Sequence, residues 1–192
     1  MTNAHARRPM ASTIAAVALA FSMGAAFPVA ALAKNPMVGG APMYASKNIV
    51  ENAVNSKDHT TLVAAVKAAG LVDTLASAGP FTVFAPTNAA FAKLPAGTVE
   101  TLVKPENKAT LTSILTYHVV PGTLTAKDLM KIAKDGGGEG QIKTVQGTPL
   151  VVQTKGKAVY LTDTKGNTAK VTIANVMQSN GVIHVINSVL QP

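Results

Sequence analysis

Histidine is the residue type with which this chain could most easily do chemistry, because imidazole can transfer protons and bind metals near neutral pH. Three histidines, His59, His118 and His184, follow the first 33 residues. No H-E-x-x-H motif is present, and no two of these histidines stand at metal-ligand spacing. His118 and His184 are each flanked by apolar residues, which predicts hydrogen-bonded positions in the core. We therefore expect no metal and no other cofactor.

The other side chains that support catalysis form no recognisable site. No serine stands in a G-x-S-x-G motif, and the nine acidic residues are scattered along the chain. The chain has no cysteine, which excludes thiol nucleophiles, disulfides and thiolate metal sites. The Gly-Gly-Gly-Glu-Gly run at 136–140 resembles a phosphate-binding loop only in composition, because no Gly-Lys-Ser/Thr follows it. The sequence predicts a protein that is not an enzyme.

The elements that must position these residues are mostly helical in the first two thirds of the chain and extended in the last third. This segregation predicts an α+β fold, with helices packed on a C-terminal β-sheet or wedge. Apolar residues at helical spacing, with capping residues before them, predict the helices, and β-branched runs between turn residues predict the strands. The expected helices span about 49–54, 58–69, 71–76, 87–94, 98–102, 105–118 and 125–133, and the expected strands about 81–85, 150–153, 158–161, 169–173 and 182–186. Thr87 is the expected cap of its helix, and Thr125 with Asp128 matches a capping box in outline.

The last of these strands has the most informative pattern. Asn180-Gly181 favours a tight turn, and Val182-Ile183-His184-Val185-Ile186 is β-branched at four of five positions. Val182 and Ile186 lie on one face, and Ile183 and Val185 lie on the other. A strand that is apolar on both faces is covered on both sides. We therefore expect this strand in the middle of the sheet.

Three ordered blocks give the chain a close resemblance to the fasciclin domain family over roughly residues 46–192. Residues 79–91, Gly-Pro-Phe-Thr-Val-Phe-Ala-Pro-Thr-Asn-Ala-Ala-Phe, resemble the first signature block of that family. Residues 115–122, Leu-Thr-Tyr-His-Val-Val-Pro-Gly, resemble its central Tyr-His block, and residues 180–192 resemble its C-terminal block. The resemblance implies the fasciclin fold and agrees with the α+β prediction.

The resemblance also implies roles for individual residues. The adhesive elements proposed for the family correspond here to Tyr117-His118 and Asn175-Val176-Met177, which are the candidate interaction residues. Asn175 and Asn187 stand where the family commonly has Asp, which weakens the case for aspartate-dependent recognition. The candidate structural residues of the signature blocks are Thr87, Asn88, Asn180, Gly181 and His184.

The N-terminal residues read as a targeting segment. Arg7-Arg8 is followed by an uncharged stretch, and Ala31-Leu32-Ala33 forms a cleavage signal. We expect a signal peptide at 1–33 cleaved after Ala33, a flexible linker at 34–45 and a fasciclin domain at 46–192. An uncleaved anchor and twin-arginine export are the alternatives. No second long apolar run follows, so we expect a secreted or periplasmic protein without a transmembrane segment after cleavage.

Charge limits the choice of partner. The formal net charge is +8, and 15 lysines with no arginine follow the targeting segment. Nucleic acid is not expected, because arginine and stackable aromatics are scarce. The expected partner is acidic polysaccharide, an envelope surface or a surface protein. A lone domain must form a weak homo-oligomer, or bind through one face only.

The expected function is non-enzymatic cell adhesion or matrix binding. The alternatives are a carrier of a carotenoid- or lipid-like molecule and, third, a hydrolase or metal-dependent enzyme.

Overall fold

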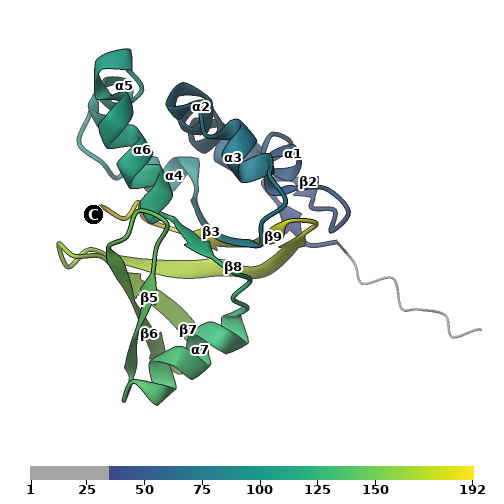
Figure 1. Ribbon diagram of the computed structural model, residues 1–192, viewed down its shortest axis with the longest axis vertical. Helices are drawn as coiled ribbons and strands as arrows, with labels where there is room; N and C mark the ends of the chain where they lie inside the picture. Colours follow the sequence, from purple (N-terminus) through teal and green to yellow (C-terminus); the bar gives the residue numbers. More distant parts are fainter. Residues whose placement is uncertain (1–34) are drawn as a thin grey trace, which may run out of the picture. The chain divides into compact units, whose positions relative to one another are not determined.

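The chain is described by a computed structural model over residues 35–192, which contain seven α-helices, two single-turn 3-10 helices and nine strands (Figure 1). The helices are α1 Ile49–Ala53, α2 Thr60–Ala69, α3 Val72–Ala76, α4 Asn88–Phe91, α5 Thr98–Leu102, α6 Lys108–Tyr117 and α7 Ala126–Asp135, with η1 Lys57–His59 and η2 Pro105–Asn107. The strands are β1 Met37–Val38, β2 Ala41–Pro42, β3 Phe81–Pro86, β4 Val119–Pro121, β5 Glu139–Lys143, β6 Pro149–Lys155, β7 Ala158–Thr162, β8 Thr168–Gln178 and β9 Gly181–Ile186.

Seven of the strands form one sheet in the order β4-β3-β9-β8-β7-β6-β5. Strand β9 runs parallel to β3 and antiparallel to β8, and every residue of β9 is buried. The prediction of a C-terminal strand inside the sheet is therefore confirmed. The long strand β8 pairs with β9 and also with β7, and its register with β9 shifts twice, between Val171 and Ile173 and between Ile173 and Val176. In Figure 1, strands β5 to β7 turn away from the β3–β9 part of the sheet.

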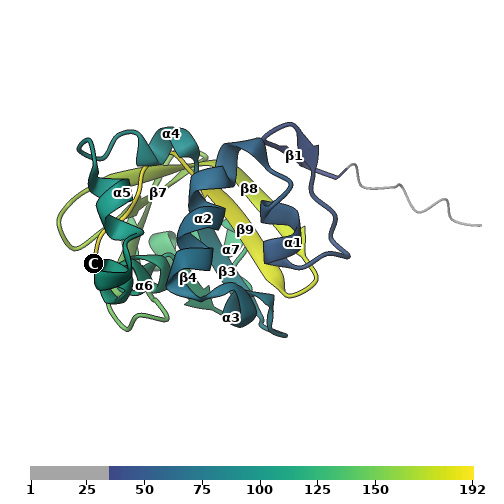
Figure 2. The same ribbon diagram turned by 90° about the horizontal axis from the view of Figure 1, so that it is seen from above.

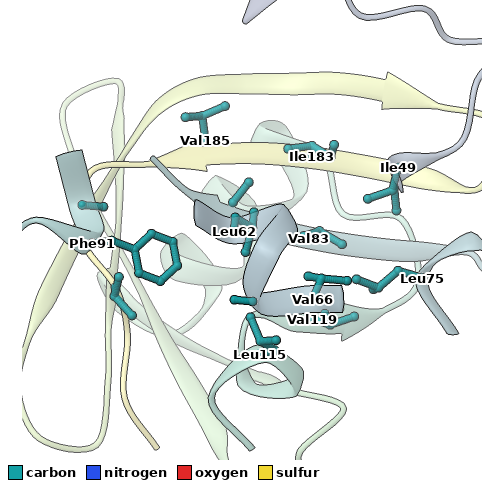
Figure 3. Close-up of a cluster of buried hydrophobic side chains, with 14 of the residues drawn as sticks. Ile49, Leu62, Val66, Leu75, Val83, Phe91, Leu115, Val119, Ile183 and Val185 are labelled. Atoms are coloured by element: carbon teal, nitrogen blue, oxygen red, sulfur yellow. The ribbon is translucent and has the colours of Figure 1, made fainter. Parts of the chain in front are cut away.

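The two faces of the sheet are covered differently, so the protein has two apolar cores. On one face, α1, α2, α3 and α6 pack on β3 and β9, and Val83, Ile183 and Val185 point toward Leu62 and Val66 of α2 (Figure 3). On the other face, Phe84 and Ile186 join side chains from α7 and from strands β5 to β8. Figure 2 shows α1, α2 and α3 lying across the first face. The predicted α+β fold is confirmed, although α7 packs with the later strands.

The segment expected to be a flexible linker is ordered from Pro36 onward. Strands β1 and β2 pair as a small hairpin, and the Met43 N–H donates to the Pro36 carbonyl at 2.9 Å. Val38 and Met43 are buried in the first core. Gly39 and Gly40, both with positive φ, form the hairpin turn, and the apolar side chains of Val38 and Met43 on either side of it reach the core. The predicted linker is corrected in this respect.

The predicted signal peptide at 1–33 lies outside the described residues. Within residues 35–192, no helix combines the length and the apolar character needed to cross a bilayer.

Candidate functional site

The Tyr117-His118 pair lies at the end of α6 and is buried. The Tyr117 hydroxyl donates to the Pro149 carbonyl at 3.1 Å. The Nε2 atom of His118 accepts the Leu190 N–H at 3.1 Å, so its Nδ1 carries the proton and donates to the Ile114 carbonyl at 2.8 Å. Both side chains therefore tie α6 to the sheet and to the C-terminal segment. Two of the five candidate interaction residues thus lie in the core, away from the surface.

Burial fixes the protonation state of His118. Desolvation lowers the pKa of His118 to about 4, although the bond to the Ile114 carbonyl and the charge of Asp163 partly oppose it. A second proton on the ring would also leave the Leu190 N–H without an acceptor. His118 is therefore neutral at physiological pH, and its two hydrogen bonds join α6 to the C-terminal segment.

His184, at the centre of β9, is arranged in the same way on the opposite face. Its Nδ1 accepts the Asn175 N–H at 3.3 Å, so its Nε2 donates to the Leu124 carbonyl at 2.7 Å. Its ring stacks on Phe84 with centroids 5.7 Å apart. Burial lowers the pKa of His184. The predicted core roles of both histidines agree with these contacts.

His59 is the third buried histidine. Its Nδ1 lies 2.8 Å from the Ser56 hydroxyl, and its Nε2 has no hydrogen-bond partner. Desolvation lowers the pKa of His59, with smaller opposing effects from the Ala85 carbonyl and Asp58. Among the described residues, no three His, Cys, Asp or Glu side chains gather as a metal site would require.

The other three candidate interaction residues occupy an irregular part of β8. Asn175 has φ = 58°, a left-handed conformation, and its side-chain oxygen accepts the Ala126 N–H at 2.7 Å at the start of α7. Val176 is buried in the first core, whereas Met177 is 41% exposed. Only Asn175 and Met177 of the five candidates therefore reach the surface. They form no hydrogen bond with Tyr117 or His118.

Thr87 and Asn88 join β3 to the helical layer. The Thr87 hydroxyl accepts the Ala90 N–H at 3.2 Å and caps α4. The Asn88 side chain accepts the Thr61 N–H at 3.0 Å and donates to the Lys57 carbonyl at 2.8 Å. These bonds fix the start of α2 against the end of β3.

Asn180 and Gly181 do the same at the start of β9. The Asn180 side chain accepts the Ile49 N–H at 3.0 Å and donates to the Leu75 carbonyl at 2.7 Å, so it joins α1 and α3 to the sheet. At Gly181, a Cβ atom would lie 1.9 Å from the Phe81 carbonyl oxygen. Only glycine allows β3 and β9 to approach this closely.

A surface feature that the sequence did not reveal lies near the C-terminus. We call it the C-terminal groove. It has a volume of about 540 Å³ and lies between the end of α4, the turn joining β7 to β8, and the C-terminal segment. Its lining includes Lys93, Leu94, Lys165, Thr168, Ser188 and Gln191. These residues come from three distant stretches, so no local motif marks them.

Comparison with known proteins identifies the fold and the family. The family model of the fasciclin domain matches residues 57–192. The chain belongs to the fasciclin family. It is 48% identical over 159 residues to protein sll1483 of Synechocystis sp., a match that covers 83% of this chain and 81% of that protein.

Two further similar proteins are informative. Cell surface glycolipoprotein MPB83 of Mycobacterium bovis is 34% identical over 164 residues, which is 85% of this chain and 64% of that protein. A solved structure of a domain pair from the insect cell adhesion molecule Fasciclin I has a TM-score of 0.67, with 20% identity, and covers 76% of this chain and 51% of that one. The second likeness shows the fold alone.

The fasciclin fold explains why asparagine is tolerated at the two positions where aspartate is common. The Asn175 side-chain oxygen accepts the Ala126 N–H, and that of Asn187 accepts the Lys170 N–H at 2.8 Å. An aspartate would offer the same acceptor at each place. Asn175 and Asn187 therefore keep the structural bond and omit the negative charge.

Proposed function

We propose that this fasciclin domain is a non-catalytic interaction module that acts outside the cytoplasm, at a cell surface, in an extracellular matrix or in the periplasm. Its relation to a cell surface glycolipoprotein supports this placement. The buried histidines support a non-catalytic role. His118 and His184 are neutral, and both ring nitrogens of each are hydrogen-bonded to backbone groups.

The observation that supports a particular class of partner is the state of the lysines. Fifteen lysines and nine acidic residues follow the targeting segment, yet residues 35–192 contain one ion pair, between Lys131 and Asp135. The remaining ammonium groups are not neutralised by a carboxylate within 4.0 Å in the described part of the chain. A surface of this kind attracts polyanions. The partner that we propose is therefore acidic polysaccharide, or an envelope that displays it.

Co-sedimentation of the purified protein with the source cells' envelopes and extracellular polysaccharide tests this function. Screening acts over about 30 Å at 0.01 M salt and about 3 Å at 1 M, so binding should be strong in the first buffer and weak in the second. No binding in either buffer would contradict the proposal. Binding that is unaffected by salt would exclude charge as its basis.

A carrier of an apolar molecule is the second candidate, and an internal cavity is the observation that bears on it. The cavity lies between α1, α2 and α3 and the β3–β9 part of the sheet, and its lining is almost wholly apolar. Its volume is about 50 Å³. An engineered apolar cavity of about 150 Å³ holds one benzene, so a carotenoid would require the helices to move outward. Colourless native protein whose organic extract contains no lipid would exclude this function.

A further inference from the structure

The C-terminal groove has the size of a small-molecule site and a lining of mixed polarity. Its volume of about 540 Å³ falls within the range of about 300–1,000 Å³ that is usual for small-molecule sites. Polar and apolar atoms line it in nearly equal measure. Leu94 supplies an apolar wall, while Asn167, Thr168 and Ser188 supply amide and hydroxyl groups. No acidic side chain lines it.

Two lysines give the groove its charge. The Lys93 ammonium donates to the Asn187 carbonyl at 2.6 Å and lies 3.4 Å from the Ser188 hydroxyl. The Lys165 ammonium donates to the Gln191 side chain at 3.1 Å. All of these acceptors are neutral, so they orient the ammonium groups without cancelling their charge. Each ammonium has three donors, and at least one on each lysine remains for a ligand.

A buried carboxylate fixes two walls of the groove relative to each other. Asp163 is 5% exposed, and its oxygens accept the N–H groups of Lys165 at 2.9 Å and of Asn167 at 2.8 Å in the turn. The same side chain accepts the Gln191 N–H at 2.9 Å in the C-terminal segment. The turn and the C-terminal segment are therefore joined through one side chain. A groove that is held open in this way loses little entropy when a ligand enters.

We infer that the C-terminal groove binds a carboxylate-bearing sugar residue of an acidic polysaccharide, an inference that rests on the proposed function. The two ammonium groups attract the carboxylate, the hydroxyl and amide side chains match the ring hydroxyls, and Leu94 meets the C–H face of the ring. Phosphate groups are a poorer match, because the groove has no arginine to bind them in a bidentate manner. No aromatic side chain lines the groove, so a neutral sugar would lack a stacking partner.

Calorimetric titration of the full-length protein with tri-galacturonate, at low salt, tests the inference. Its methyl ester is the matched neutral probe, and inorganic phosphate is the control for an unspecific anion. We expect binding of tri-galacturonate, with at least about tenfold weaker binding of the ester and of phosphate. Equal binding of the ester would overturn the inference, since the carboxylate would then contribute nothing. Equal binding of phosphate would reduce the groove to a general anion site and would also overturn it.

Charge-matched variants locate the site. Lys93→Gln with Lys165→Gln removes both groove charges, and Lys127→Gln with Lys134→Gln removes two exposed charges from α7. The first pair should weaken binding of tri-galacturonate by about tenfold or more, and the second pair by less than about twofold. Equal losses would mean that binding depends on net charge and not on the groove. Unchanged binding in the first pair would also contradict the inference.

A third variant leaves both lysines in place. Thr168 is exposed at the start of β8, and Thr168→Glu puts a carboxylate into the groove. It should abolish binding of tri-galacturonate, and retained affinity would contradict the inference. The proposed function can be separated from this site by repeating envelope co-sedimentation with the Lys93 and Lys165 double variant. Retained envelope binding with lost tri-galacturonate binding would reject the groove as the adhesive site but keep the module function.

Discussion

The centre of the sheet and the C-terminal groove use polar groups in opposite ways. Around β9, the ring nitrogens of His118 and His184 all have backbone partners, and burial lowers the pKa of both side chains. In the groove, the ammonium groups of Lys93 and Lys165 contact neutral acceptors only and are not paired with a carboxylate. In the first region, the histidine ring nitrogens are hydrogen-bonded within the protein. In the second, each ammonium group has at least one N–H donor left for a partner. Stability and binding are therefore expected to depend on separate residues.

The largest effect should come from Gly181, which belongs to the first region. Gly181→Ala puts a Cβ atom 1.9 Å from the Phe81 carbonyl oxygen, so β3 and β9 must separate. We expect the free energy of unfolding to fall by about 3 kcal/mol or more. Gly156→Ala is the matched control, because Gly156 has φ = 62° but open space around it, and it should cost about 1 kcal/mol. Equal costs in urea unfolding would show that β3 and β9 tolerate the added atom.

Ile183 tests the central position of β9 through packing. Its side chain is buried in the first core, and Ile183→Ala should cost about 2–4 kcal/mol through lost burial and the cavity that remains. Val145→Ala is the control, because Val145 is 46% exposed and should change stability by no more than about 0.5 kcal/mol. A cost for Ile183→Ala as small as that of the control would contradict the two-core description.

The buried histidines should make stability sensitive to acid. The pKa of His118 is about 4 in the folded protein and about 6.5 when unfolded, so the unfolded chain takes up the proton first as pH falls. The stabilisation is complete above pH 6.5 and is lost between about pH 6.5 and pH 4. From pH 7 to pH 5, His118 alone should lower the free energy of unfolding by about 2 kcal/mol. His59 and His184 are shifted in the same direction and add to the loss.

Urea unfolding of His118→Gln at the two pH values isolates this contribution. The variant should be less stable at pH 7 and should lose less stability on acidification than the unmodified protein. The same pH dependence in both proteins would show that His118 is not the group that titrates.

The smallest effect concerns Asn187, one of the two asparagines that stand where the family commonly has aspartate. Asn187→Asp keeps the acceptor for the Lys170 N–H and should change stability by less than about 0.5 kcal/mol. Asn187→Ala removes that acceptor and should cost about 1 kcal/mol. If the aspartate variant were as costly as the alanine variant, the side-chain oxygen would not be what matters at this position.

Sequence patterns predicted the parts of the molecule in which local residues specify local structure. The β-branched run at 182–186 predicted the buried strand, and Thr87 and the Thr125–Asp128 pair predicted helix caps that the structure contains. The same local reasoning missed the hairpin at 37–42, because the burial of Val38 and Met43 depends on a core formed by distant residues. The family resemblance, in contrast, made Tyr117 and His118 candidate interaction residues. Both are buried, and their partners, Pro149 and Leu190, lie far along the chain.

The C-terminal groove could not be predicted for a related physical reason. Lys93, Lys165 and Ser188 are neighbours only in the folded protein, because the C-terminal segment lies against both the end of α4 and the turn that follows β7. Each of them alone looks like an ordinary surface residue in the sequence. Because these residues lie far apart in the sequence, the site that they form has no recognisable sequence motif.

The most direct test measures stability and affinity side by side in two variants, Ile183→Ala and the Lys93 and Lys165 double variant. Ile183→Ala should unfold at a lower urea concentration than the unmodified protein. Under conditions in which the variant is folded, it should bind tri-galacturonate with the affinity of the unmodified protein. The double variant should unfold at the unmodified midpoint and should lose about tenfold or more in affinity. Loss of affinity in Ile183→Ala while it remains folded, or full affinity in the double variant, would contradict the separation of stability from binding.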